Sequence, residues 1–168
     1  MKKIILGLVI GILLPLLGGY LFVISGNMPV RVKGPNLPFE KFIARKALRA
    51  AMKNEIQKPS PLKADETNLL QGAKVYQNQC AVCHGLPEQR RTAIAMGLFP
   101  PPPQLFGDDT VTDDPVGETY WKAKNGIRLT GMPGFQDSLS DVELWSVSLL
   151  LANADKLPKS VKTALAPK

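Results

Sequence analysis

Both cysteines and the single histidine of the chain lie in one five-residue segment, CAVCH, at positions 80–84. The pattern C-x-x-C-H is the signature of covalent attachment of a c-type haem. The thiols of Cys80 and Cys83 fall on one face of a helical turn, where they can form thioethers with the two vinyl groups of one porphyrin. His84 follows at once, which places its ring under the iron as the proximal ligand.

Two other kinds of site use cysteine and histidine in this way. A redox dithiol of the thioredoxin type expects a preceding strand and a βαβ context, which the sequence around Cys80 lacks. A zinc site needs four protein ligands, or three and a water, and the chain has no second pair of Cys or His. A plain disulfide between Cys80 and Cys83 leaves His84 without a role. The sequence therefore favours haem attachment.

The sixth position of a haem iron held by one histidine decides between an electron carrier and a catalyst. The candidate ligands are Met28, Met52, Met96 and Met132. Met28 and Met52 lie far upstream, and Met96 lies in the apolar stretch TAIAMGLF, which is typical of a packing methionine. The sequence GMPG around Met132 predicts a rigid irregular loop that presents one thioether. We expect Met132 to be the ligand, with core packing as the alternative.

Four segments between about residues 66 and 156 resemble a class I, single-haem cytochrome c: GAKVYQNQCAVCHG, FPPPPQLF, YWKAKNGIRLTGMPGF and LSDVELWSVSLLLAN. The resemblance is strongest to membrane-anchored bacterial domains related to the cytochrome subunits of haem–copper oxidases. It implies Cys80 and Cys83 as thioether anchors of one haem c, and His84 and Met132 as axial ligands. It also implies an all-α cytochrome c fold, with three to five helices around the haem, and electron transfer without substrate chemistry.

Charge is distributed unevenly along the chain. Residues 1–64 carry 11 Lys and Arg against two Glu, whereas residues 65–168 carry 10 Lys and Arg against 12 Asp and Glu. The basic excess therefore belongs to the N-terminal part. This part lacks the aromatic platforms of nucleic-acid-binding proteins, so nucleic acid is not an expected partner.

The N-terminal segment predicts a single membrane span. Residues 4–24 are uncharged and mostly apolar, which is long enough to cross a bilayer. A cleaved signal peptide has a shorter apolar core and a small-residue cleavage site. We therefore expect residues 1–25 to be an uncleaved signal-anchor and transmembrane helix, with cleavage near the sequence VISGN as the alternative.

The charges beside this span and the resemblance together indicate its orientation in the membrane. Lys2 and Lys3 favour a cytoplasmic N-terminus, although Arg31, Lys33 and Lys41 dilute that bias. Attachment of c-type haem outside the cytoplasm, as the resemblance implies, resolves the orientation. We expect the bacterial cytoplasmic membrane, with the haem domain on the periplasmic side or on the outer face of a Gram-positive cell.

Residues 26–64 form a basic linker that contains a predicted juxtamembrane helix. The sequence PFEKFIARKALRAAMKNEIQK begins with Pro38 and spaces Phe39, Ile43 and Ala47 along an apolar stripe, opposite a basic face. This helix could lie on anionic lipid headgroups, pack against the haem domain or a partner subunit, or serve as a solvated spacer. Residues 65–158 then form the cytochrome c domain, and residues 159–168 a C-terminal tail.

Three packing predictions follow within the haem domain. The helix that runs into Cys80 has an apolar face, and Gly72 on it would permit close approach of a last helix. That last helix begins with a capping box at Ser140–Glu143, and we expect its Trp145 to pack on the Gly72/Tyr76 face.

Two further predictions concern the segments between these helices. A carbonyl of one proline among residues 100–103 accepts the Nδ1–H of His84 and so fixes the ring; a polyproline II protein ligand is the other interpretation of this stretch. A helix with Asp114 as its N-cap and Pro115 in its first turn ends at Gly126.

The sequence thus predicts a carrier of single electrons between membrane-associated redox complexes, and not an enzyme. The expected partners are membrane lipid and a quinol–cytochrome c reductase, a terminal oxidase or a periplasmic dehydrogenase. One alternative is a dedicated haem subunit of one oxidase or dehydrogenase. Another is a haem peroxidase or ligand sensor, for which the chain has no second histidine to place on the distal side.

Overall fold

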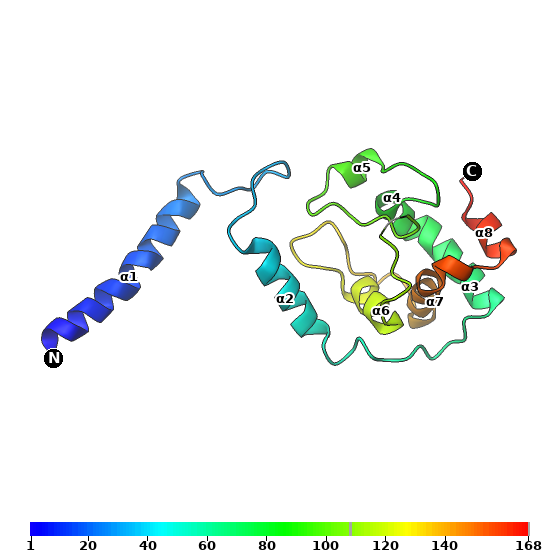
Figure 1. The fold of residues 1–168 in the computed structure, drawn as a ribbon, viewed down its shortest axis with the longest axis horizontal. Helices are drawn as coiled ribbons and strands as arrows, with labels where there is room; N and C mark the ends of the chain where they lie inside the picture. Colours follow the sequence, from blue (N-terminus) through cyan, green and yellow to red (C-terminus); the bar gives the residue numbers. More distant parts are fainter. Residues whose placement is uncertain (108, 168) are drawn as a thin grey trace. The chain divides into compact units, whose positions relative to one another are not determined.

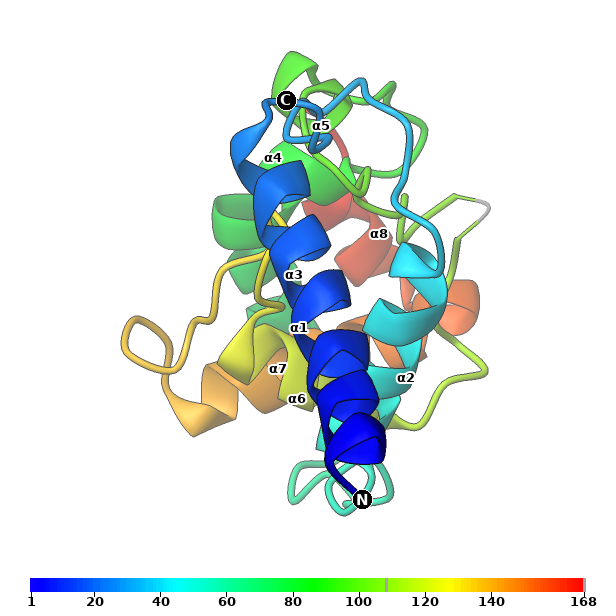
Figure 2. The ribbon, with the colours of Figure 1, turned by 90° about the vertical axis from the view of Figure 1, so that its left-hand side faces the viewer.

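The protein is all-helical in its computed structural model, which describes residues 1–107 and 109–167. Within these ranges no strand occurs, and the helices run from α1 near the N-terminus to α8 near the C-terminus (Figure 1, Figure 2). The predicted all-α class is confirmed. The chain divides into two compact units, Met1–Glu40 and Lys41–Lys168.

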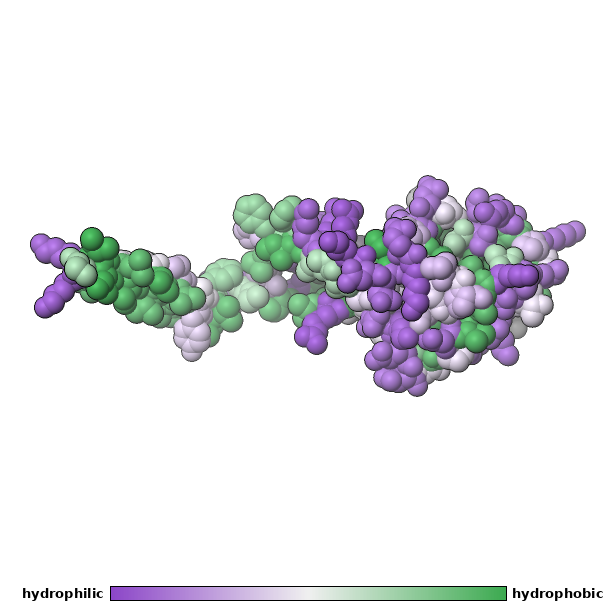
Figure 3. Space-filling view, turned by 90° about the horizontal axis from the view of Figure 1, so that it is seen from below, coloured by the Kyte–Doolittle hydropathy of each residue, from purple (hydrophilic) through white to green (hydrophobic). Residues whose placement is uncertain are grey.

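The first unit contains one long apolar helix, α1 (Lys2–Ile24), with Pro15 in its interior. Its side chains are exposed along its whole length, and they colour it mostly as hydrophobic in Figure 3. Its 23 residues are long and apolar enough to cross a membrane. This agrees with the predicted N-terminal apolar helix ahead of the haem domain.

The second unit is built around the crossing of α3 (Glu66–Val75) and α7 (Asp141–Ala152). A Cβ at position 72 would collide with the backbone carbonyl of Ser146, so glycine is what lets the two backbones approach so closely. On the same face of α3, Leu69 and Ala73 are buried, as the sequence pattern predicted.

The prediction for Trp145 was wrong. The residues of α7 that meet Gly72 are Ser146 and Leu150, whereas Trp145 faces α6 (Val116–Asn125) and stacks on Tyr120. Because α7 is buried on nearly all sides, from Leu144 to Leu151, it has two packing faces. The sequence pattern could not show which face each large side chain would occupy.

The C-terminal segment is part of the core. Although the sequence suggests a tail after residue 158, α8 (Lys159–Leu165) packs against α3, with Val161 and Leu165 fully buried. A short 3₁₀ turn, Ala154–Lys156, connects α7 to this helix.

The basic juxtamembrane segment forms α2 (Glu40–Met52), which from Lys41 onward belongs to the second unit and is buried there at its C-terminal end. Met52 is only 2% exposed. The chain that follows α2 passes so close to α6 that a Cβ at Gly117 would lie 2.8 Å from the carbonyl oxygens of Glu55, Ile56 and Lys58.

Several predicted helix ends are confirmed. Ser140 and Glu143 form the complete capping box of α7, and α6 ends at Gly126, whose φ is 66°. The start of α6 differs slightly, because Pro115 itself takes the N-cap position and no side chain caps the helix.

Candidate functional site

The CAVCH segment follows α3 through a change of helical pitch. A single π-helical turn, Tyr76–Cys80, joins α3 to the short helix α4 (Ala81–His84). Tyr76 is fully buried, its hydroxyl donates to the Gly85 carbonyl at 2.7 Å, and its ring meets Phe106 edge-on. Burial first, and Cys80 second, raise the pKa of Tyr76 far above its usual value, so the hydroxyl stays a donor. This bond fixes the turn directly after His84.

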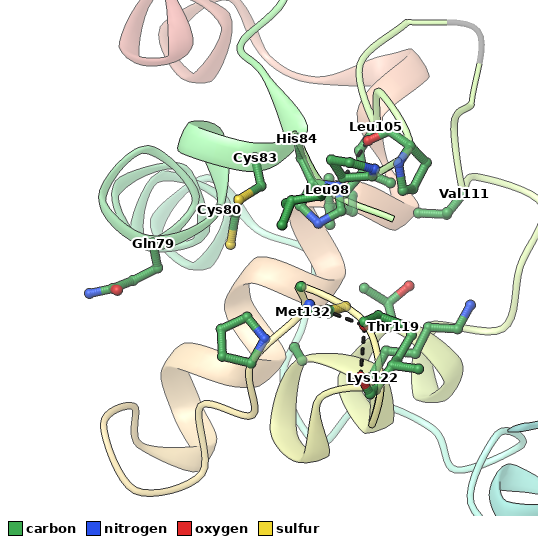
Figure 4. Close-up of a pocket in the computed structure, with 18 of the residues that line it drawn as sticks. Gln79, Cys80, Cys83, His84, Leu98, Leu105, Val111, Thr119, Lys122 and Met132 are labelled. Carbon is green, nitrogen blue, oxygen red and sulfur yellow. Dashed lines mark hydrogen bonds between the residues drawn. The ribbon is translucent and has the colours of Figure 1, made fainter. Parts of the chain in front are cut away.

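Cys80, at the end of the π-helical turn, and Cys83, in α4, both point into one cavity, where their sulfurs face the same space (Figure 4). They form no disulfide with each other. Burial first, and Cys83 second, raise the pKa of Cys80 to about 12. A nucleophilic redox cysteine needs a lowered pKa, so this environment disfavours the thioredoxin-type interpretation.

His84 is oriented by the proline-rich loop. Its Nδ1 lies 2.8 Å from the Pro103 carbonyl oxygen, and Nδ1–H therefore donates to it. The prediction that a carbonyl among residues 100–103 holds the ring is confirmed, and the residue is Pro103. Burial lowers the pKa of His84, and the bond to Pro103 offsets this only partly. The ring is thus neutral at pH 7 with Nε2 free, which is the form that binds a metal.

Met132 lies on a loop that follows α6 and is fixed by short-range hydrogen bonds. The Ile127 amide donates to the Met132 carbonyl at 3.1 Å. The Thr130 hydroxyl donates to the Ile127 carbonyl at 2.7 Å and accepts from the Met132 amide at 3.1 Å. The backbone at Gly134 passes against the end of α6, where only glycine fits at Gly126. The loop is therefore held rigidly against α6.

These four residues meet around one cavity, into which His84 and Met132 project from opposite sides (Figure 4). Among the described residues, Met132 is the only methionine that lines this cavity. Met96 is 63% exposed, and Met52 is buried elsewhere in the unit. The walls are mostly apolar, although Gln79, Thr119 and Lys122 also line them. The larger apolar side chains of the walls include Leu48, Leu98, Pro100, Pro101, Pro102, Pro103, Leu105, Val111, Ile127, Phe135, Val147 and Leu151.

The cavity fits a haem group in its chemistry. Its walls supply the apolar surroundings that a porphyrin needs, two thiols for thioether bonds, and one nitrogen and one thioether ligand of the kinds that bind haem iron. The part of the chain that the structure describes holds no cluster of three or more His, Cys, Asp or Glu for another metal. Ligation by His84 and Met132 stays a prediction.

Sequence reasoning missed two contributors to the site. Leu48 reaches the cavity from α2, outside the segment that resembles a cytochrome, and it lies about 100° around the helix from Ala47 on the predicted apolar stripe, so the pattern gave no sign of its role. Thr130 was not singled out, although a hydroxyl two residues before a loop methionine is well placed for a local hydrogen bond to the backbone.

Part of the chain matches a known protein family. Residues 67–149 match the model of the family described as cytochrome c oxidase, cbb3-type, subunit III. A solved structure from Kuenenia stuttgartiensis, the reducing HAO-like protein complex, includes a chain with 24% sequence identity and a TM-score of 0.48. The alignment covers 56% of this chain and 46% of that chain, so it spans less than half of that relative. No curated protein matches the sequence.

Proposed function

Because residues 67–149 belong to the class I c-type cytochromes related to the oxidase subunits, we propose that this chain is a membrane-tethered carrier of single electrons. The domain carries one covalently attached haem c. When bound, haem c supplies an iron that changes its charge by one between Fe(II) and Fe(III). Cys80 and Cys83 would hold it covalently, and His84 and Met132 would bind its iron.

The observation that carries this proposal is the placement of His84 and Met132 on opposite sides of one apolar cavity (Figure 4). If both side chains bind the haem iron, as proposed, no position would remain on it for a substrate such as O₂ or peroxide. A thioether ligand favours Fe(II) and raises the reduction potential relative to two nitrogen ligands. The chain therefore supports electron transfer and not bond-making chemistry.

The protein's own contribution is to keep the ligands in place while the charge changes. The Pro103 carbonyl holds the His84 ring, and the Thr130 hydroxyl and Ile127 backbone hold the Met132 loop. The apolar walls exclude water from the ligand bonds. A site whose atoms move little between two oxidation states has a small reorganisation energy for each electron transfer.

The membrane setting completes the proposal. Helix α1 anchors the chain in the bacterial cytoplasmic membrane, and the haem domain lies on the periplasmic side. The partners are membrane redox complexes such as a quinol–cytochrome c reductase, a terminal oxidase or a periplasmic dehydrogenase. A tether raises the effective concentration of the carrier near such partners, and a weak docking surface suffices for rapid exchange.

The test compares two methionine variants of the ferric holoprotein by absorption spectroscopy. We expect wild type to show the sulfur-to-iron band near the red end of the spectrum, and Met132→Ala to lose it. Met96→Ala removes an exposed methionine outside the cavity, so it should keep the band. Persistence of the band in Met132→Ala would assign the sulfur ligand to another residue, and carbon monoxide binding by reduced wild type would show an open haem site. Either result would overturn the proposal.

A further inference from the structure

Helix α2 has two different faces, and one of them packs against the haem domain. Leu48 lines the cavity, and Met52, one turn later, is 2% exposed. The chain after the helix is clamped against α6 at Gly117, where three backbone carbonyls leave no room for a side chain. The helix is therefore fixed to the domain that holds the haem.

The other face of α2 exposes large apolar side chains that have no packing partner within the described structure. Phe42 and Ile43 are each 61% exposed, and Phe39, directly before the helix, is 76% exposed. At 100° per residue, Phe42 and Ile43 lie on the side of the helix opposite to Leu48. Two large apolar residues that cluster on one exposed helix face indicate a surface that is covered in the working protein.

The same helix carries a concentrated positive charge. Its basic residues have only Glu40 as an acidic neighbour on the helix, and none of them forms an ion pair with another described residue. Lys46 lies over the Phe42 ring, with Nζ 5.9 Å from the ring centroid. The basic residues of α2 and the residue after it are Lys41, Arg45, Lys46, Arg49 and Lys53.

The position of α2 in the chain decides which anionic surface it meets. Only residues 25–39 separate it from the end of α1. A 15-residue linker spans at most about 50 Å when fully extended, and about 20 Å on average when flexible. A membrane entered by α1 therefore lies within reach. Basic residues beside exposed Phe and Ile are the pattern of helices that lie in the headgroup region of anionic lipids.

We propose that α2 lies on an anionic membrane surface through Phe42, Ile43 and the basic residues on the same side of the helix, Lys46, Arg49 and Lys53, while Leu48 and Met52 hold the haem domain on its opposite side. This rests on the membrane anchoring in the proposed function. It follows that the haem cavity is held about one helix diameter, roughly 10–12 Å, from the headgroups. The domain then has a fixed orientation toward partners embedded in the same membrane.

The experiment uses the full-length holoprotein in lipid nanodiscs. Cys80 and Cys83 are consumed by the haem, so a nitroxide reagent reacts only with the new thiol of Ile43→Cys. In the reduced state, we compare relaxation of the nitroxide by oxygen, which partitions into lipid, with relaxation by a water-soluble nickel chelate. In discs containing phosphatidylglycerol, we expect oxygen to relax the nitroxide at Ile43→Cys more strongly than the chelate does. At Gln89→Cys, an exposed loop position, we expect the chelate to relax it more strongly.

Two charge variants test the role of the basic residues. Each Lys or Arg near an anionic surface strengthens attachment about fivefold, so Lys46→Gln/Arg49→Gln/Lys53→Gln should weaken it on the order of 100-fold. The nitroxide should then become open to the chelate. The matched variant Lys156→Gln/Lys159→Gln/Lys162→Gln removes the same charge from exposed sites near the C-terminus, and it should leave the protection unchanged.

The outcomes separate this inference from the proposed function. Equal access of the chelate to position 43 in phosphatidylglycerol discs and in discs of phosphatidylcholine alone would overturn the lipid-binding role of α2. Protection that survives the Lys46/Arg49/Lys53 variant would do the same. The sulfur-to-iron band, recorded on the ferric form of every sample before reduction, reports the haem site independently. Failure of the chain to stay with the discs would instead overturn the anchoring on which the inference rests.

Discussion

The ring of Tyr120 stacks on the ring of Trp145, with their centroids 3.9 Å apart and their planes within 10°. The Tyr120 hydroxyl donates to Asp141 Oδ1 at 2.8 Å. Lys124 Nζ donates to both the Tyr120 oxygen and Asp141, at 2.9 Å and 3.2 Å. These contacts join α6 to the start of α7. The Met132 loop begins at the C-terminal end of α6, so the contacts that fix α6 to α7 also help to fix the start of this loop.

Asp141 makes this junction sensitive to pH. The hydrogen bond from Tyr120 first, and that from Lys124 second, hold the pKa of Asp141 below its usual value. A carboxylate with a lowered pKa in the folded state contributes stability above its unfolded pKa, near 3.9, and loses it as the pH falls through the folded value. Because Asp141 is exposed, we expect Asp141→Asn to lower the free energy of unfolding at pH 7 by only about 0.5 kcal/mol.

Denaturant unfolding of the ferric holoprotein, followed in the Soret band, measures this difference. The gap measured at pH 7 should close at an acidic pH below the lowered folded pKa of Asp141, where both side chains are uncharged. The control is Asp155→Asn, at an exposed carboxylate without an ion pair among the described residues, which should change little at either pH. A cost for Asp141→Asn that is the same at both pH values would show that its charge is irrelevant.

Gly72 should tolerate no larger residue. In Gly72→Ala the new methyl group would overlap the Ser146 carbonyl, which belongs to backbone and cannot move aside alone. Helices α3 and α7 must then separate, and we expect a loss of about 2–4 kcal/mol in the free energy of unfolding. Gly97→Ala is the matched control, because a Cβ there would meet its nearest atoms at an ordinary 3.4 Å. Equal stability of the two variants would refute the close crossing.

Local patterns predicted the parts of the site that depend on neighbouring residues. The CAVCH turn, the capping box at Ser140 and the helix end at Gly126 all depend on residues within one or two turns of each other. The identity of Pro103 as the partner of His84 could only be narrowed to four prolines. The sequence of a proline-rich loop does not show which of its carbonyl groups faces the histidine.

The parts that sequence reasoning missed depend on long-range packing. Trp145 was assigned to the wrong neighbour because α7 is buried on nearly all sides, so its pattern carries no preferred direction. Residues 159–168 were expected to be a C-terminal tail, yet they include α8, whose Val161 and Leu165 complete the core beside α3. The π-helical turn that ends at Cys80 has no sequence signature of its own.

The apo domain should fold poorly. The cavity between His84 and Met132 is lined mostly by apolar side chains, and without the haem these must either face water or collapse together. We therefore expect Cys80→Ala/Cys83→Ala, which cannot attach haem, to lose much of its helical circular dichroism and its cooperative melting. The wild-type holoprotein, in the same detergent, gives the reference signal. An apo variant with full helicity and a sharp thermal transition would contradict this expectation.

Thr130 should set how firmly Met132 is held. Its hydroxyl makes two hydrogen bonds within the loop, one to the Ile127 carbonyl and one from the Met132 amide. Thr130→Val keeps the shape of the side chain and removes both bonds, each of which contributes about 1 kcal/mol. The methionine should then leave the iron more readily, so added imidazole should displace it at a concentration lower by about fivefold or more.

The measurement is a titration of the ferric holoprotein with imidazole, followed by loss of the sulfur-to-iron band. Thr130→Ser retains the hydroxyl and should bind imidazole with nearly the affinity of wild type. A general loss of stability would affect both variants, whereas loss of the loop hydrogen bonds affects only Thr130→Val. If Thr130→Val and wild type bound imidazole equally, the loop would be held by its glycines and its contact with α6, and the hydroxyl would have no part in keeping Met132 on the iron.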